Sequence, residues 1–327
     1  MRLGACLSLT GRYARFGTQA ARALRLWSGW EPDVELVVLD DTSTPDRVAP
    51  TLHELAARCD LVLGPYSTQL MRAANRVAPL LPTLVWNHGG SGDDVETACP
   101  GRVVSLLTPT SGYAEPFVRI LAGRPTSAPL VLVAGAGGFA RQVVQGAQIS
   151  AARHGISTIR GDLTSVPDRG AWDLMCAGSF EQDVEVVRRA RTLPRPPRTI
   201  GAVAAGVAEF AEAVGDPDGV YGVAQWLPGQ RGRAQLGPSE DQLLRAYRDA
   251  DGRTPDYPAV QAVAAAVVAT HCARLGGLDV DSLWRTATRL RTRTVFGAYG
   301  VEPITGAQVD HRMVLARWAG HSLVRAG

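Results

Sequence analysis

The sequence contains few cysteines, and they form no recognisable motif. Five are present, and no two of them have the CxxC spacing. A structural zinc site and a dithiol redox motif both need closely spaced cysteines, so neither is predicted. Because the number is odd, at least one thiol stays unpaired, while a disulfide between two of the others remains open. The cysteines are Cys6, Cys59, Cys99, Cys176 and Cys272.

Long apolar runs and blocks of like charge are also missing. No run approaches the roughly 18 apolar residues that span a bilayer. The net charge is only +3, and the arginines are interspersed with acids, so composition gives no reason to expect nucleic acid or a membrane surface as a partner. What the chain does have is 46% hydrophobic residues over 327 positions, which is typical of a folded protein with two domains.

Strand-like and helix-like segments alternate along the chain, and the alternation restarts after a turn at residues 108–112. This pattern predicts an α/β fold with two doubly wound parallel sheets. Three predicted helices at residues 239–290 indicate that the chain then returns to the first sheet before it crosses back. The predicted strands of the first sheet lie at residues 3–9, 34–39, 61–63, 83–86 and 103–107.

One glycine motif permits a nucleotide-dependent enzyme. Gly135, Gly137 and Ala140 match the G-x-G-x-x-A spacing of dinucleotide-binding loops, after a predicted strand and at the start of a predicted helix. The motif opens the second sheet rather than the first, and glycine is abundant throughout the chain. A cofactor at residues 135–140 is therefore retained only as an alternative, and the main interpretation has no cofactor.

Catalysis and metal binding lack further support. His88 lies beside Asn87 and ahead of Asp93 and Asp94, which invites a catalytic role. No serine or cysteine stands in a nucleophile elbow such as G-x-S-x-G, and no second histidine has the spacing of a metal site. The sequence therefore predicts a protein that is not an enzyme and has neither a catalytic residue nor a metal site.

Aromatic residues recur where predicted strands end. Loops at strand ends lie on the surface, where so many aromatic side chains would be exposed unless they face a shared cleft. A cleft with aromatic walls and a few polar groups is typical of a small-molecule site. The residues concerned are Phe16, Tyr66, Trp86, Phe139, Phe180 and Trp226.

The segment 61–95 combines two such loops. One predicted strand ends at a Gly-Pro corner, and a helix follows from Tyr66, Ser67 and Thr68; the next strand ends in a polar, glycine-rich loop at residues 87–92. In open α/β sheets, ligands bind at the carboxyl ends of strands, where free backbone N–H groups meet the positive end of a helix. The segment therefore predicts half of a small-molecule cleft.

Taken in order, the loops of this chain carry a family resemblance. Their motifs lie at residues 9–17, 40–45, 64–68, 86–91, 257–259, 294–297 and 306–308. Each motif alone has low specificity, but their order and spacing together are more specific. Over essentially its whole length the chain resembles the type I periplasmic substrate-binding proteins of the branched-chain amino-acid uptake class, such as leucine-binding proteins.

The resemblance implies two α/β lobes that are joined by three crossover hinges and close on a ligand in the cleft between them. Lobe one would contain residues 1–110 and 228–293, and lobe two residues 111–227 and 294–327. The implied function is non-catalytic binding of a small organic ligand, as the solute-binding component of an ABC-type uptake system with a permease as partner.

The resemblance also implies the ligand-binding residues. Phe16 stands where an aromatic side chain packs on the ligand, and the loops at residues 66–68 and 88–91 stand where a ligand carboxylate is held. Lobe two contributes aromatic or polar positions. The implied site residues are Phe16, Tyr66, Ser67, Thr68, Trp86, His88, Gly89, Gly90, Ser91, Tyr113, Phe139, Phe180, Ala205 and Trp226.

One position departs from the amino-acid binders that this family contains. Those proteins have an acidic residue in lobe two that pairs with the ligand ammonium, and Ala205 stands at that position here. A buried ammonium without a counter-charge costs on the order of several kcal/mol. The expected ligand is therefore an aromatic or otherwise flat molecule, neutral or acidic, and not an ordinary α-amino acid.

The start of the sequence leaves the location open. Met1 is followed at once by a predicted strand with no secretion signal ahead of it, although the family normally carries one. Two roles are therefore expected as alternatives. The chain is either an extracytoplasmic binding protein whose leader has been removed or a cytosolic ligand-sensing regulator on the same fold, with a regulatory partner protein.

Overall fold

The computed structural model describes residues 1–126, 128–229 and 232–326. The chain divides into two compact units. Unit 1 comprises Met1–Pro109 and Trp226–His311, and unit 2 comprises Thr110–Gln225 and Arg312–Gly327. The chain therefore passes from one unit to the other three times, in agreement with the three crossovers that the resemblance implies.

The unit boundaries differ from the expected lobes in one substantial segment. Residues 294–311 were expected in lobe two, but they belong to unit 1. The hairpin of β11 (Thr292–Thr294) and β12 (Gly297–Tyr299) carries them into that unit. Val295, Phe296 and Tyr299 are almost completely buried in its hydrophobic core, which explains the difference.

Unit 1 is built on a five-stranded, fully parallel sheet with the order β2-β1-β3-β4-β5. Alternate residues of β1 face opposite sides, because Leu3, Ala5 and Leu7 belong to one hydrophobic cluster and Cys6 to another. Burial on both faces makes β1 and β3 continuous apolar runs in the sequence. The strands are β1 (Arg2–Leu7), β2 (Glu35–Asp40), β3 (Leu61–Leu63), β4 (Val85–Asn87) and β5 (Val103–Ser105).

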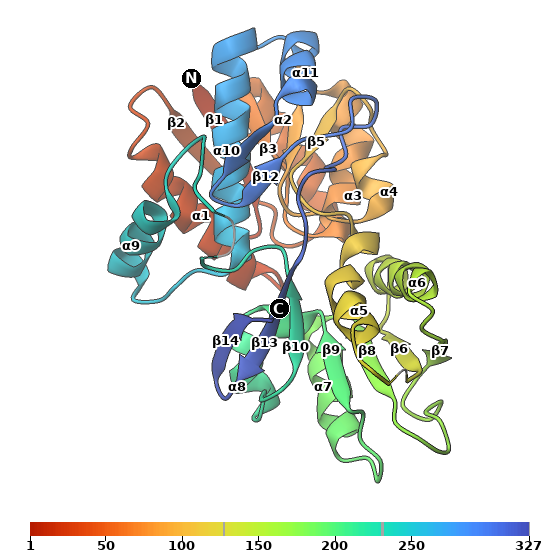
Figure 1. Cartoon of the computed structure of the whole chain (residues 1–327). Helices are drawn as coiled ribbons and strands as arrows, with labels where there is room; N and C mark the ends of the chain where they lie inside the picture. The colour runs from red at the N-terminus through yellow and green to blue at the C-terminus, as the bar shows by residue number, and fades with distance from the viewer. Residues whose placement is uncertain (127, 230–231, 327) are drawn as a thin grey trace. The chain divides into compact units, whose positions relative to one another are not determined.

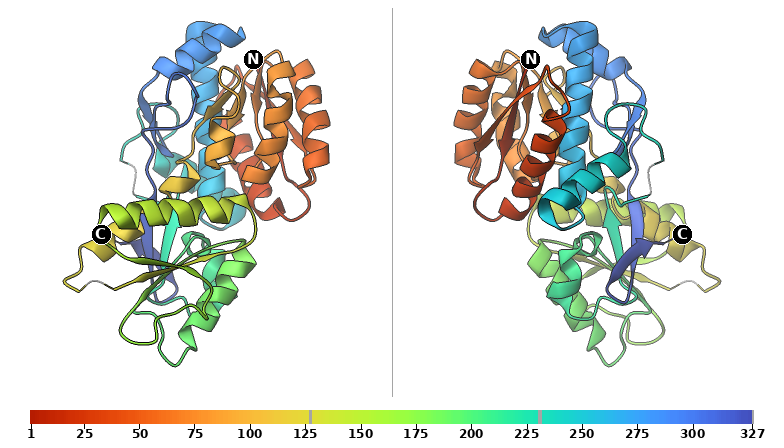
Figure 2. Two further views of the ribbon diagram at one scale, coloured as in Figure 1. Left: turned by 90° about the vertical axis from the view of Figure 1, so that its right-hand side faces the viewer. Right: turned by 90° about the vertical axis from the view of Figure 1, so that its left-hand side faces the viewer.

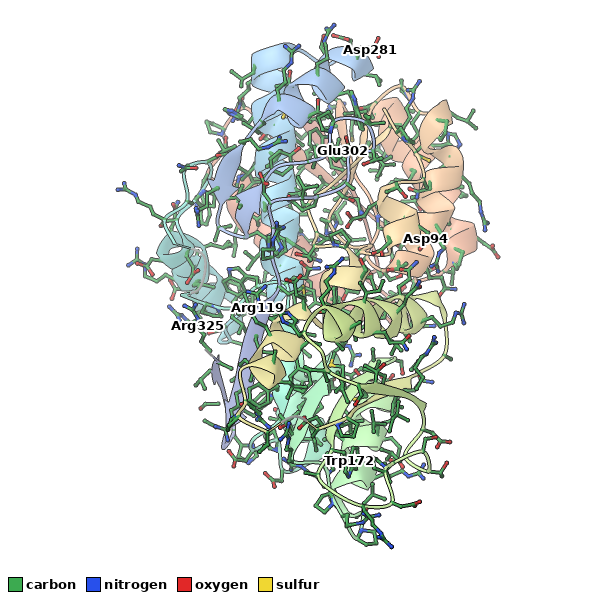
Figure 3. All side chains as sticks on the ribbon, turned by 45° about the vertical axis from the view of Figure 1, so that its right-hand side comes forward. Asp94, Arg119, Trp172, Asp281, Glu302 and Arg325 are labelled. Carbon is green, nitrogen blue, oxygen red and sulfur yellow. The ribbon has the colours of Figure 1, made fainter. Side chains whose placement is uncertain are left out.

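Helices cover both faces of this sheet. On one face lie α2 (Pro45–Arg58) and α3 (Thr68–Val77), and on the other lie α1 (Ala14–Ser28) and α10 (Tyr257–Gly276) (Figure 1). The left view of Figure 2 shows α10 in blue and the orange helices on opposite sides of the strands. The remaining helices of unit 1 are α4 (Asp93–Glu96), α9 (Glu240–Asp251) and α11 (Val280–Arg289), and Figure 3 marks Asp281 at the start of α11.

Helix α10 corrects one expectation from the sequence. It is long and apolar enough, by length and composition, to be a candidate membrane span, although no such run was predicted. Of its qualifying 18-residue window, 78% is buried inside the fold, where it packs against α1 and the sheet. Burial of this kind is typical of a core helix. Its N-terminus lies at the edge of unit 1 where the strands end (Figure 1).

Unit 2 contains a seven-stranded sheet with the order β14-β13-β10-β9-β8-β6-β7. The strands β10, β9, β8, β6 and β7 are parallel. The last stretch of the chain adds β13, antiparallel to β10, and then β14, antiparallel to β13. The buried Trp172, labelled in Figure 3, precedes β8 and donates its indole N–H to the Arg195 carbonyl at 3.1 Å. The strands are β6 (Leu130–Ala134), β7 (Thr158–Gly161), β8 (Asp173–Ala177), β9 (Thr199–Ala202), β10 (Tyr221–Ala224), β13 (Val314–Ala319) and β14 (Ser322–Arg325).

Two pairs of helices cover this second sheet. Two hydrophobic clusters, one on each face, contain α5 (Glu115–Ala122) with α6 (Gly138–Arg153) and α7 (Phe180–Arg191) with α8 (Glu209–Val214). The prediction of an α/β fold with two doubly wound parallel-sheet units is therefore confirmed.

Candidate functional site

The first two strands of unit 1 end in loops that two aspartates hold in place. Asp40 accepts hydrogen bonds from the Leu9 amide at 2.8 Å and from the Thr10 hydroxyl at 2.7 Å. The buried Asp41 accepts one from the Ser8 hydroxyl at 2.7 Å. Both carboxylates are therefore engaged within unit 1.

The N-terminus of α3 lies at the same edge and is capped by Ser67. The Ser67 hydroxyl accepts a hydrogen bond from the Leu70 amide at 3.2 Å, and the Ser67 amide donates to the Gly89 carbonyl at 2.9 Å. Among the described residues the cap provides no acceptor for the first two helix amides, those of Thr68 and Gln69, so both are available to an outside acceptor. Ser67 adopts φ 92° and ψ 147°, a region almost confined to glycine. The positive end of α3 can hold an anion.

Two glycines allow the loop after β4 to pack against this helix start. A Cβ atom on Gly89 would lie 2.4 Å from Tyr66 Cα, and one on Gly90 would lie 2.6 Å from Met71 Cβ. The amides of both glycines donate to Asn87 Oδ1, at 3.2 and 2.8 Å. These two predicted site residues therefore shape the loop, and their amides are already bound within the protein. Asn87 was not among the predicted residues, although its place at a strand end was an available signal.

Aromatic rings from three segments meet near the start of α3. Phe16 stacks on Tyr66 with ring centroids 4.6 Å apart, and Tyr13 meets the same ring edge-on at 6.0 Å. The hydroxyl groups of Tyr66 and Tyr257 lie 2.9 Å apart, and the Arg15 guanidinium lies 4.8 Å from the Phe16 centroid. The structure thus brings Phe16 and Tyr66 together as predicted, and Tyr257, the first residue of α10, joins them.

Trp86 and Trp226 are core side chains of unit 1. Both are at most 1% exposed and belong to the hydrophobic cluster that also contains α10. The prediction that they line a surface cleft is wrong, because the helices of unit 1 cover their rings. Within the described part of the chain, neither indole N–H has a hydrogen-bond partner.

The polar residues His88, Thr68 and Ser91 are buried at this edge of unit 1. Burial outweighs a hydrogen bond with the Gly64 backbone that favours the protonated form of His88. Burial lowers the pKa of His88 to about 4, so the imidazole is neutral at pH 7. A neutral imidazole can donate one hydrogen bond and accept one, but it brings no positive charge to a ligand.

The predicted site residues of unit 2 fall into two groups. Tyr113 accepts a hydrogen bond from Gln225 Nε2 at 2.8 Å and packs edge-on against Phe139 at 5.6 Å. Phe180 begins α7 and is partly buried in the cluster on the other face of the sheet. Ala205 is fully buried in that same cluster. Within unit 2 the structure joins Tyr113 with Phe139 and places Phe180 and Ala205 apart from them.

The glycine motif at residues 135–140 serves helix capping and packing. Gln182 Oε1 accepts the amides of Ala136 at 3.3 Å and Ser179 at 2.9 Å, as part of the capping box of α7. A Cβ atom on Gly135 would lie 2.3 Å from the same oxygen. A loop amide that a phosphate would need is therefore already bound. Among the residues that the structure describes, no group of three or more His, Cys, Asp or Glu side chains could hold a metal ion.

Comparison with known families agrees with this architecture. The family model described as periplasmic binding protein matches residues 1–322. The chain belongs to the periplasmic binding protein family. Among curated protein sequences, none gives a significant match to this periplasmic binding protein.

Solved structures share the fold of this periplasmic binding protein at low sequence identity. A leucine-binding protein from Thermotoga maritima MSB8 is 14% identical with a TM-score of 0.84, over 100% of this chain and 98% of its own. A branched-chain amino acid transporter substrate-binding protein from Streptococcus pneumoniae, in complex with isoleucine, is 14% identical with a TM-score of 0.80, over 99% and 97%. A solute-binding protein of an ABC transporter from Rhodopseudomonas palustris BisB5, in complex with 3,4-dihydroxybenzoic acid, is 14% identical with a TM-score of 0.76, over 100% and 96%. The expected type I fold is confirmed.

Proposed function

We propose that this periplasmic binding protein binds a small organic solute without chemical turnover, as the solute-binding component of an ABC-type uptake system. Family membership supports this role and implies a permease as partner. The observation within the chain that carries the proposal is the N-terminus of α3. Its Ser67 cap leaves two amides open beside the stacked rings of Phe16 and Tyr66.

The ligand class that we infer is an aromatic or otherwise flat molecule, neutral or acidic. A helix N-terminus suits an acid group, and stacked rings suit a flat body. Ala205 is buried and brings no charge, so this position provides no counter-ion for a ligand ammonium. One solved structure with this fold holds isoleucine and another holds 3,4-dihydroxybenzoic acid, so the fold alone leaves both classes open.

Two parts of the sequence-based interpretation stay predictions. One is that the lobes close on the ligand in a shared cleft. The other is the alternative role as a cytosolic ligand-sensing regulator, which would use the same solute site with a different partner protein.

A thermal-shift screen of the purified protein tests the proposal. The panel contains aromatic and aliphatic acids, α-amino acids, sugars and NAD. Because a ligand that binds only the folded state stabilises it by mass action, we expect an aromatic acid to raise the Tm and leucine to leave it unchanged. Stabilisation by leucine or valine would overturn the ligand class. Stabilisation by NAD would favour the enzyme alternative, and a panel without any stabilising solute would overturn solute binding.

A further inference from the structure

Unit 1 carries a basic groove between the end of α10 and α11. Its volume is about 360 Å³, and none of its described lining residues is acidic. Arg285 and Arg289 lie one turn apart on α11, and both are exposed. Neither arginine belongs to an ion pair within the described part of the chain, although Arg285 donates to the Ser282 hydroxyl at 2.9 Å. The groove is lined by Leu275, Ser282, Arg285, Thr286, Arg289 and Leu290.

Two leucines stand exposed at this groove. Leu275, which lines it, is 66% exposed near the end of α10, and Leu278 is 44% exposed in the turn that leads to α11. Apolar side chains exposed beside polar and charged ones are typical of a contact surface. This surface fits a partner that offers acidic groups beside an apolar recess.

Unit 2 contains an acidic groove with these properties. It has a volume of about 380 Å³ and lies along α7, beside the carboxyl ends of β6 and β8, and none of its described lining residues is basic. Glu181 and Glu185 are exposed, one turn apart on α7. Asp183 also lines the groove, but it is buried and accepts the Ala204 amide at 2.9 Å. The apolar recess of the groove is made by Val133, Ala134, Cys176 and Val186.

The two grooves match in charge, spacing and apolar content. Each presents two like charges four positions apart on one helix, and the two pairs are opposite in sign. An arginine guanidinium and a glutamate carboxylate can form two parallel hydrogen bonds, which adds geometric specificity to the attraction. Complementary charge of this kind selects partners and fixes their register. Every copy of the chain offers both grooves, so a second copy provides the matching surface.

We propose that the basic groove of one copy binds the acidic groove of a second copy. Arg285 and Arg289 then pair with Glu181 and Glu185, and Leu275 enters the apolar recess. Two different surfaces meet, so the contact is heterologous and can repeat from copy to copy. Because the contact is small, the association is weak and reversible. This inference does not depend on which solute the protein binds.

Charge reversal tests the contact by sedimentation equilibrium of the full chain at concentrations up to about 1 mM, which suits a weak association. One variant combines Arg285→Glu with Arg289→Glu, and the other combines Glu181→Arg with Glu185→Arg. Each variant alone has two grooves of like charge, so its self-association should be at least about tenfold weaker than that of the wild type.

An equimolar mixture of the two variants should restore the association. The unchanged acidic groove of the first variant meets the unchanged basic groove of the second, and the two reversed grooves also attract each other. The mixture should therefore associate as strongly as the wild type. Raising the salt concentration from about 50 mM to about 500 mM should weaken the association of both, because salt screens exposed charges.

The combination of Arg76→Glu with Arg153→Glu is the matched control. It changes the net charge as much as the first variant does, and both arginines are exposed in the last turns of α3 and α6, outside the two grooves. This control should associate like the wild type. If a charge-reversed variant fails to fold, Leu275→Ser at the exposed end of α10 carries the test, and it should also weaken the association.

Four outcomes would overturn the proposal. The first is a wild-type protein that stays monomeric at every concentration and salt level. The second is self-association that survives both charge reversals, which would assign the contact to other surfaces. The third is a mixture of the two variants that stays monomeric while the wild type associates, since the two grooves would then not meet. The fourth is an equal loss of association in the control, which would trace the effect to net charge.

Discussion

The hydroxyl groups of Tyr66 and Tyr257 lie 2.9 Å apart, although 191 residues separate them in the sequence. Tyr66 stands just before α3, and Tyr257 is the first residue of α10. Their hydrogen bond therefore joins the first segment of unit 1, Met1–Pro109, to its second segment, Trp226–His311. Burial raises the pKa of Tyr257 above its usual range, so the phenol stays protonated near neutral pH and can act as a donor.

Replacing Tyr257 with Phe should remove this link at modest cost. The Tyr66 hydroxyl is only half-buried and can turn to water, so the free energy of unfolding should fall by about 1 kcal/mol, the net value of one hydrogen bond. Urea unfolding at pH 7 measures the change. A loss well above about 3 kcal/mol would show that the ring of Tyr257, rather than its hydroxyl, holds the two helices together.

Replacing Ser67 with Gly should stabilise the protein. Glycine loses only a few tenths of a kcal/mol as a helix cap, whereas it relieves the strain of φ 92°, which costs other residues about 1–3 kcal/mol. Ser67→Ala keeps the strain and loses the cap, so it should destabilise by about 1 kcal/mol. Thermal and urea unfolding of both variants give the comparison, and a glycine variant less stable than the wild type would refute the strain argument.

A methyl group at Gly89 should disrupt the start of α3. The added Cβ would lie 2.4 Å from Tyr66 Cα, so the loop after β4 would have to move away from the helix. We expect Gly89→Ala to lower the free energy of unfolding by about 2 kcal/mol or more and to weaken solute binding.

Gly29 at the end of α1 is the matched control for this substitution. It has φ −66°, and the nearest atom to an added Cβ is 3.4 Å away. Gly29→Ala should leave both stability and binding close to those of the wild type. Equal effects of the two substitutions on unfolding and on binding would contradict the account of Gly89.

His88 should make unit 1 sensitive to acid. Its pKa is about 4 in the folded protein and 6.5 without burial, so below pH 6.5 the unfolded state binds a proton that the folded state does not. Stability should therefore be unaffected at pH 7 and should decline as the pH falls from 6.5 towards 4, by roughly 3 kcal/mol in total at 1.36 kcal/mol per pH unit.

The comparison of His88→Phe with the wild type isolates this contribution from the titration of surface carboxylates. The free energy of unfolding is measured for both proteins between pH 7 and pH 4. The variant should lose less stability than the wild type over this range. Parallel curves for the two proteins would show that His88 does not titrate in this way.

The sequence predicted several strands well, but it did not predict which side chains other parts of the fold bury. The apolar run at β3 was predicted with its observed bounds, because it is buried and flanked by turn residues. Strand β10 (Tyr221–Ala224), with its alanine and glycine, was not predicted. Short strands of this kind have little apolar signal of their own and form because a neighbouring strand pairs with them.

The burial of the aromatic residues at strand ends could not be predicted from the sequence. Phe16 and Tyr66 do meet, but Trp86 and Trp226 are covered by helices of unit 1, including α10, which is remote from Trp86 in the sequence. The hydrogen bonds from the Gly89 and Gly90 amides to Asn87 could not be predicted either, because they depend on the conformation of the loop rather than on residue spacing. The segment 294–311 was placed in the wrong unit because its core contacts are made with residues far away in the sequence.

Isothermal titration calorimetry of the purified chain with 4-hydroxybenzoate and with leucine tests the central claim most directly. The ligand-free protein is first obtained by unfolding, dialysis and refolding, so that no bound solute hides the site. The account predicts saturable 1:1 binding of the aromatic acid and no heat of binding with leucine. Saturable binding of leucine, with none of the acid, would contradict it.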